Sequence, residues 1–184
     1  MTSTLFVEEL KGRTSGTNAN KVIVPSGQKI AWTDTGSVYA PGMVIQTVVS
    51  EFTTGNVNPS ANATWTTVGP NVTITPKFSN SKVLVTHSCA GLISNTFYAA
   101  VRFLRGSTDI GTHWGLTDNT NYIPIKLDMI NYDNPATTSA TTYYVQTYAS
   151  QNYTQFHYNY YGSGDGGTRQ CLLMAQEIAQ WQVH

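Results

Sequence analysis

The chain has 184 residues and a mass of 20.1 kDa, which suits one domain that buries a core without a metal ion or a disulfide. Only 11% of its residues are charged, and ten basic and ten acidic side chains give a formal net charge of zero. A neutral chain lacks the attraction that supplies most non-specific affinity for nucleic acid, so DNA, RNA and anionic membranes are not expected partners. No apolar run approaches the roughly 18 residues that a membrane-spanning helix requires.

Residues 1–42 differ in composition from the rest and predict an extended N-terminal arm for attachment, followed by a compact domain over residues 43–184. Two arm segments are too apolar for a solvated tail, and we expect them to bind a partner. The residues of these segments are Leu5, Phe6, Val7, Val22, Ile23 and Val24. A Pro25-Ser26-Gly27 turn closes the second segment, which is predicted to form a strand that pairs outside the domain or along its side. A disordered tail is the alternative.

Beyond Gly42, alternating apolar and polar residues recur with turn signals between them, and no convincing helix is found. Strands are predicted over residues 44–52, 64–68, 72–75, 82–93, 97–105, 108–111, 122–131, 141–149, 154–161 and 169–178. Pro124 marks its strand as an edge strand. Many short strands without helical crossovers predict an all-β fold, an antiparallel two-sheet sandwich of the jelly-roll type. An immunoglobulin-like topology is the main rival.

Three predicted strands carry large apolar or aromatic residues on both faces. In the first strand, Val101 and Phe103 lie on one face and Leu104 on the other. The second has Leu172 and Met174 on one face and Leu173 on the other, and the third has Tyr143 and Tyr144 on opposite faces. A sandwich covers only one face of each sheet, so the second apolar face must contact something else. We expect self-association, and three copies around an axis lined by aromatic residues would accommodate these faces. The sequence does not fix the number of copies.

The usual signatures of catalysis are missing from the sequence. Its histidines, His87, His113, His157 and His184, show no metal-ligand spacing. Asp109, Asp118 and Asp165 lie in separate loops, and nothing requires two carboxylates to face each other across a cleft. The glycine-rich run 162–167 lacks the Lys-Ser/Thr ending of a phosphate-binding loop. We therefore predict a protein that is not an enzyme and that requires no metal or cofactor.

The two cysteines, Cys89 and Cys171, lie inside apolar strand patterns rather than in a close pair. Free buried thiols are therefore favoured over a disulfide. His87 shares a strand face with Cys89, which in principle allows a thiolate and its base, but adjacent inward positions in a core explain the spacing better.

Tyrosine gives the only functional signal of any size, because seven of its residues lie between positions 143 and 161. Flat aromatic faces beside neutral amides suit a sugar ring or a protein partner. The candidate contacts with a glycan or partner are Tyr148, Tyr153, His157 and Tyr161. Packing in the core or between subunits is the alternative.

Five segments carry motifs in a fixed order: Ser3–Gly12, Thr73–Val85, Val101–Ile110, Asp133–Pro135 leading to Thr142–Val145, and Leu172–Ile178. In this order they resemble a group of bacteriophage virion proteins, many of them from cyanophages and marine phages. The resemblance implies a trimeric jelly-roll knob on the outside of a virion. It also implies a role without catalysis, either as a capsid cement or decoration protein or as a tail-fibre module.

An arm followed by one knob favours the cement role, because a fibre normally has a long shaft. The arm would add strands to capsid subunits or fill grooves on them, while trimerisation multiplies weak contacts. The implied partners are other copies of the chain and the major capsid protein or a tail component. In the receptor-binding alternative, the partner is a host surface glycan. A free carbohydrate-binding module is less favoured. The expected location is the virion, after synthesis in the host cytoplasm, since Met1–Gly16 does not resemble a secretory signal.

Overall fold

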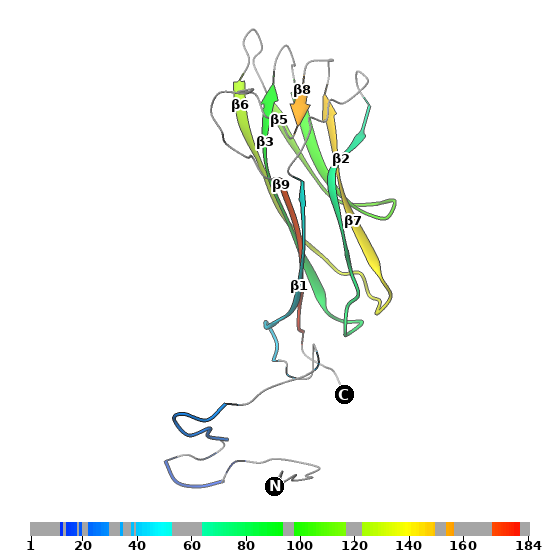
Figure 1. Cartoon of the computed structure of the whole chain (residues 1–184). Helices are drawn as coiled ribbons and strands as arrows, with labels where there is room; N and C mark the ends of the chain where they lie inside the picture. Colours follow the sequence, from blue (N-terminus) through cyan, green and yellow to red (C-terminus); the bar gives the residue numbers. More distant parts are fainter. Residues whose placement is uncertain are drawn as a thin grey trace, which may run out of the picture. The chain divides into compact units, whose positions relative to one another are not determined.

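The computed structural model describes residues 12, 14–17, 19, 22–29, 34, 38, 40–52, 64–93, 98–116, 123–149, 154–156 and 171–180 (Figure 1). The chain divides into two compact units, Met1–Asp34 and Thr35–His184. Several predicted contact residues fall outside the described set, namely Leu5, Phe6, Val7, Tyr153, His157 and Tyr161.

In the unit Met1–Asp34, the apolar segment Val22–Val24 is exposed and belongs to no strand. The predicted turn after it is confirmed, because the Gln28 amide donates to the Pro25 carbonyl at 3.1 Å. Gly27 has a φ of 84° in this turn, which an L-residue with a side chain rarely adopts. Whether a partner strand covers the segment remains a prediction.

The described part of the unit Thr35–His184 contains nine strands and no helix. They are β1 (Val44–Phe52), β2 (Thr66–Ile74), β3 (Lys82–Ile93), β4 (Tyr98–Arg105), β5 (Thr108–Leu116), β6 (Ile123–Asp133), β7 (Thr141–Ala149), β8 (Thr154–Phe156) and β9 (Cys171–Ile178). One sheet has the order β1-β9-β3-β6, and the other has the order β2-β7-β4-β5 (Figure 1). The short β8 pairs with Gly91–Ile93 of β3, beyond the Lys82–Ser88 stretch that pairs with β9.

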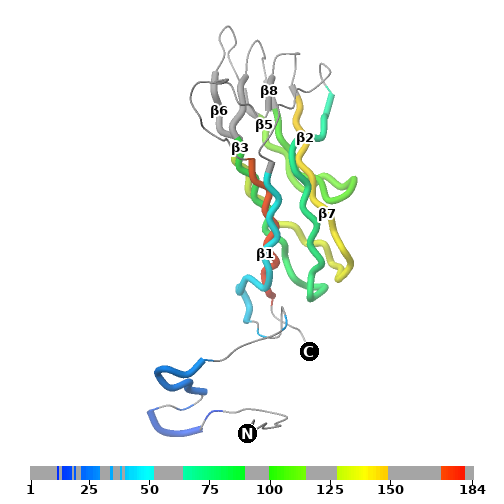
Figure 2. Tube along the Cα trace, in the orientation of Figure 1, coloured from blue at the N-terminus to red at the C-terminus, as the bar shows by residue number. Residues whose placement is uncertain are grey.

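The strand pairs are nested along the sequence. Strands β4 and β5 form the innermost antiparallel pair, and β3·β6, β2·β7 and β1·β9 enclose it in turn. The chain therefore doubles into one long hairpin whose successive pairs alternate between the two sheets, and Figure 2 shows the outermost pair, β1 and β9, side by side. This is the jelly-roll topology, so the predicted fold is confirmed and the immunoglobulin-like alternative is wrong.

Most strand bounds agree with the alternation in the sequence, but two predicted strands are merged and β5 extends to Leu116, beyond its predicted end at Gly111. The predicted strands at 64–68 and 72–75 are parts of β2, and the Gly69-Pro70 step between them is a bulge where the register shifts. Gly69 has a φ of 72° there, and Pro70 is tolerated because β2 lies at the edge of its sheet. Strand β6 is also an edge strand, as Pro124 predicted.

The inner faces of the two sheets form one core. Its largest fully buried side chains include Tyr143, Phe103, Ile74 and Leu173. Each buried side chain of this size contributes about 1.5–3 kcal/mol relative to exposure, so the core is a main source of the stability of the sandwich.

The expectation of free thiols is wrong, because Cys89 and Cys171 form a disulfide. Strands β3 and β9 are neighbours, and the register that pairs Ser88 with Leu172 places the two cysteines directly opposite each other, with Cα atoms 4.4 Å apart. Both side chains point into the core. The bond also removes Cys89 as a candidate thiolate beside His87. The pairing of β3 with β9 is a long-range feature that local alternation cannot reveal.

We predict that replacing both cysteines by serine lowers the free energy of unfolding by about 2–5 kcal/mol, because the bond closes a long loop in the unfolded chain. Chemical denaturation of both proteins measures this difference. Alkylation of the wild type in denaturant without a reductant should label neither cysteine, whereas labelling of both by mass spectrometry would contradict the disulfide.

Candidate functional site

Three aromatic rings gather on the outer face of the β2-β7-β4-β5 sheet. Tyr148 on β7 pairs with Ala100 on β4, and Ala100 pairs with Trp114 on β5. Trp65 directly precedes β2, whose Thr66 pairs with Thr147, so Trp65 lies opposite Tyr148. The ring centroids are 5.4 Å apart for Trp65 and Tyr148, 5.5 Å for Tyr148 and Trp114, and 6.0 Å for Trp65 and Trp114. We call Trp65, Tyr148 and Trp114 the aromatic cluster.

The alternation along β7 explains why these rings face outward. Tyr143, Val145 and Thr147 are buried in the core, whereas Tyr148 belongs to the opposite, half-buried set. Ala100 is only 2% exposed although it lies on the outer face, while Trp114 remains 60% exposed. An alanine between larger residues leaves room for rings from β7 and β5 to approach each other. The cluster therefore presents one accessible indole on a packed aromatic base.

A row of polar side chains crosses the same sheet next to the aromatic cluster. Thr67, Gln146, Arg102 and Thr112 pair in succession across β2, β7, β4 and β5. The Arg102 Nε and Nη2 atoms donate to Gln146 Oε1 at 3.0 and 2.6 Å, and Gln146 Nε2 donates to Thr67 Oγ1 at 3.0 Å. With Asp109 of β5, these residues form what we call the polar row.

Asp109 balances the charge of Arg102 in the polar row. Its Oδ2 atom lies 3.4 Å from Arg102 Nη1 and accepts a 2.8 Å hydrogen bond from Thr112 Oγ1, while its Oδ1 atom accepts one from the Gly111 amide. The Arg102 guanidinium also lies 4.1 Å from the centre of the Trp65 ring, a cation–π distance. An ion pair this exposed adds little stability, but the combined contacts hold the guanidinium in one orientation.

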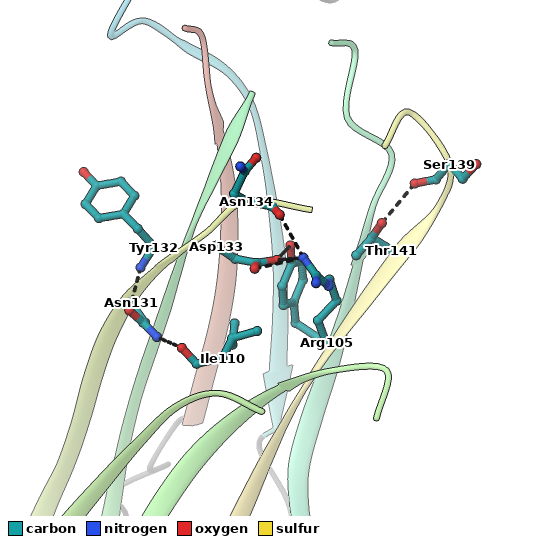
Figure 3. Close-up of polar contacts among 9 residues, drawn as sticks. Arg105, Ile110, Asn131, Tyr132, Asp133, Asn134, Ser139 and Thr141 are labelled. Carbon is teal, nitrogen blue, oxygen red and sulfur yellow. Dashed lines mark hydrogen bonds and ion pairs between the residues drawn. The ribbon is translucent and has the colours of Figure 1, made fainter. Parts of the chain in front are cut away.

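A second polar cluster joins the two sheets (Figure 3). Asp133 at the end of β6 accepts hydrogen bonds from Arg105 Nη1 at 3.0 Å on both carboxylate oxygens, and from the Tyr143 hydroxyl at 2.7 Å. Arg105 also donates to the Asn134 carbonyl at 3.1 Å. Arg105 and Tyr143 belong to the β2-β7-β4-β5 sheet, so Asp133 connects its own sheet to the opposite one.

The environment of Asp133 changes the chemistry of Tyr143. Burial raises the pKa of the Tyr143 hydroxyl far above its usual value, and the hydrogen bond to the Asp133 carboxylate and the charge of that carboxylate raise it further. The positive charge of Arg105 opposes this shift. Tyr143 therefore stays protonated and donates to Asp133 throughout the physiological pH range.

A buried glutamate binds the β2–β3 turn. Glu177 on β9 is fully buried, and its Oε1 atom accepts hydrogen bonds from the amides of Lys77 at 2.8 Å and Phe78 at 3.2 Å. Its Oε2 atom accepts one from Gln46 Nε2 at 2.6 Å. Glu177 thus has a framework role, because its carboxylate binds two amides of the turn.

A group of apolar side chains lies on the outer face of the other sheet. Val49, Met174, Thr86 and Ile130 pair in succession across β1, β9, β3 and β6, and Tyr132 pairs with Leu84 in the next row. Exposure reaches 48% for Val49, 62% for Ile130 and 59% for Tyr132. The two outer faces therefore differ, since one gathers aromatic rings beside a hydrogen-bonded row. The other carries a group of apolar side chains among polar ones such as Thr47, Gln176 and Asp128. We call the residues Val49, Leu84, Ile130, Tyr132 and Met174 the apolar face.

Of the predicted glycan or partner contacts, the structure places only Tyr148, which lies in the aromatic cluster. The sequence reasoning missed Trp65, Trp114 and Arg102. Trp114 was missed because its strand was predicted to end at Gly111, whereas β5 continues to Leu116. Extending the alternation beyond Gly111 would have placed Trp114 on an outer face.

The described residues contain no group of three or more His, Cys, Asp or Glu side chains that could hold a metal ion. They also contain no helix with the length and hydropathy required to cross a membrane.

The chain matches no protein-family model, and no curated protein is similar to it. Among solved structures, it is similar to a mutant VP2 protein of infectious bursal disease virus in derived T=1 particles. That match has 12% identity and a TM-score of 0.36, and covers 83% of this chain and 41% of the other. The structure of the infectious bursal disease virus Gx strain matches with 13% identity and a TM-score of 0.29 over 73% of this chain and 37% of the other. This chain thus spans less than half of each of those two chains.

We predict that Tyr143 makes the fold sensitive to alkali. Above about pH 10, the usual pKa of tyrosine, the unfolded chain releases this phenolic proton while the folded chain keeps it, so stability falls as pH rises. In this range the free energy of unfolding should fall with pH more steeply for the wild type than for Tyr143→Phe, which has no phenolic proton to release. The difference in slope should approach about 1.4 kcal/mol per pH unit. Urea unfolding of both proteins between pH 8 and 11 measures this difference, and parallel curves would contradict it.

Proposed function

We propose that the protein is a non-enzymatic structural component of a virion, a homotrimeric cement or decoration protein on the outer surface of a bacteriophage head. The observation that carries this proposal is the apolar face. Ile130 and Val49 are exposed on the two edge strands of a regular sheet, with Met174 and Leu84 on the two strands between them. An extended apolar surface of this kind is typical of a protein–protein interface.

The occupant we propose for the apolar face is the same face of further copies of the chain. Met174 and Leu84 at its centre are half-buried, and Ile130 and Tyr132 lie at the β6 edge, so a second copy would bury both the centre and the edge. A closed ring of three copies gives every chain the same contacts and leaves no such face exposed. Trimerisation also multiplies weak contacts with a larger assembly.

The motifs that resemble phage virion proteins support the same proposal, because the structure gives them shared framework roles. Segments Thr73–Val85 and Leu172–Ile178 meet where Glu177 accepts hydrogen bonds from the Lys77 and Phe78 amides. Arg105 and Asp133 belong to two further motif segments and bind each other. The resembling residues are therefore those that hold the knob together, which is expected if the shared property is the knob itself.

Attachment to the capsid is assigned to the arm. Its Val22, Ile23 and Val24 side chains are exposed in the single chain, and an extended apolar segment can add a strand or fill a groove on the major capsid protein. A tail-fibre or receptor-binding module is the second candidate, and the exposed indole of Trp114 in the aromatic cluster favours it.

We predict that the wild type has a mass of about 60 kDa in sedimentation equilibrium, three times the 20.1 kDa of one chain. Ile130→Glu should dissociate it to monomers, because each copy would bring a carboxylate into an apolar contact. Trp114→Ala on the other sheet is the matched control and should keep the wild-type mass. A monomeric wild type, or an Ile130→Glu variant that keeps its mass, would exclude the apolar face as the trimer interface.

We also predict that replacing Val22, Ile23 and Val24 by serine weakens attachment to phage capsids that lack the protein by at least about tenfold, equal to about 1.4 kcal/mol. Co-sedimentation with such capsids measures attachment. The variant should remain trimeric, and its unfolding midpoint should not change because the core lies in the other unit. Lys29→Ser, in the same exposed stretch, is the control. Attachment equal to wild type would remove the arm from the proposed mechanism.

A further inference from the structure

We propose that the aromatic cluster and the polar row together bind a neutral sugar, a hexopyranose unit of a surface glycan. This site lies on the β2-β7-β4-β5 sheet and uses no residue of the apolar face, so it does not depend on the proposed trimer. Its two rows are adjacent and each crosses the sheet, which gives an aromatic strip beside a hydrogen-bonding strip.

The aromatic strip suits the apolar face of a sugar ring. The C–H groups on one face of a hexopyranose pack against an aromatic surface, and the exposed Trp114 indole offers the largest side-chain surface for this contact. Trp114 already meets Trp65 and Tyr148 in edge-to-face contacts with interplanar angles of 70° and 64°. Because these contacts restrict the indole before any ligand arrives, binding would cost little side-chain entropy.

The polar strip suits sugar hydroxyls, which both donate and accept hydrogen bonds. The Thr67 hydroxyl accepts from Gln146 and keeps its O–H to donate, whereas the Thr112 hydroxyl donates to Asp109 and can accept. The exposed Asp109 carboxylate accepts strongly. Asp109 is oriented before binding by the Gly111 amide at 2.9 Å and by Thr112 Oγ1 at 2.8 Å. Acceptors and donors therefore lie in one line beside the indole.

The charge balance of the polar row selects an uncharged ligand. Arg102 and Asp109 neutralise each other, and the Arg102 donors to Gln146 and Asp109 are already engaged. An anionic sugar would have to compete with Asp109 for the guanidinium and would approach a chain with a formal net charge of zero. A neutral sugar faces neither cost.

The surroundings of the site favour a sugar over a protein. A standard protein interface buries about 800 Å² on each partner, far more than three rings. On this sheet such an interface would extend over polar groups such as Thr73 and Thr142, whose hydroxyls bond each other at 2.8 Å, and exposed Asn71. A single sugar unit can contact the two rows without covering these groups.

The test uses the full-length protein and tryptophan fluorescence, because Trp65 and Trp114 lie in the proposed site. The neutral probes are maltohexaose, cellohexaose, laminarihexaose, mannohexaose and a galactose hexasaccharide, and the charged contrasts are sialyllactose and a heparin hexasaccharide. We expect at least one neutral probe to bind with a Kd below 1 mM (~4 kcal/mol), and the charged probes to bind at least about tenfold more weakly.

Variants then assign the binding to the site. Trp114→Ala should weaken binding of that neutral probe at least about tenfold, and Trp114→Phe should recover part of the loss, because a smaller ring still stacks. Thr73→Ala, on the same face but outside both rows, should bind as wild type does. Unchanged unfolding midpoints exclude loss of the fold. Solution binding reports on single sites, so this test does not depend on the trimer or on attachment to capsids.

Two results would overturn the proposal. One is the absence of binding to every neutral probe up to 10 mM (~3 kcal/mol). The other is binding that Trp114→Ala leaves unchanged, which would place the sugar elsewhere. Binding of the charged probes alone would contradict the argument from the Arg102–Asp109 balance and count against it equally.

Discussion

Two buried carboxylates, Asp133 and Glu177, constrain how the chain closes on itself. Asp133 on β6 is bound by Arg105 and Tyr143 of the opposite sheet, and Glu177 on β9 is bound by amides of the β2–β3 turn. Removing a carboxylate from water costs several kcal/mol, so each position is stable only with its partners in place. Asp133 pairs with Val83 in one sheet, whereas Arg105 pairs with Tyr143 in the other. The contacts of Asp133 with Arg105 and Tyr143 therefore fix the alignment of the two sheets.

With this alignment fixed, the two outer faces follow from strict alternation. The strands that bury Tyr143, Val145 and Leu173 must turn their remaining side chains outward. On the β1-β9-β3-β6 sheet those side chains include the apolar face, and on the β2-β7-β4-β5 sheet they include the aromatic cluster and the polar row. In our proposals, the first surface contacts other copies of the chain and the second binds a small neutral ligand.

Local alternation and turn chemistry predicted most of the strands and the jelly-roll type. The Gly69-Pro70 step led to the prediction of two strands where there is one. Glycine and proline occur both in loops and at bulges, and only the pairing of β2 with β7 shows that this step is a bulge. The Cys89–Cys171 bond and the aromatic cluster could not be predicted, because both depend on which distant strands become neighbours. Trp65 and Trp114 are separated by two intervening strands in their sheet, and no short-range pattern relates them.

The central claim is that the two outer faces have different roles, and a crystal structure of the full-length protein in its solution assembly tests it most directly. The account predicts that β1-β9-β3-β6 sheets from neighbouring copies face one another around a three-fold axis. Ile130 and Val49 would be buried between copies, and Trp114 would remain open to solvent. An assembly that buries Trp114 and leaves Ile130 exposed would contradict the account.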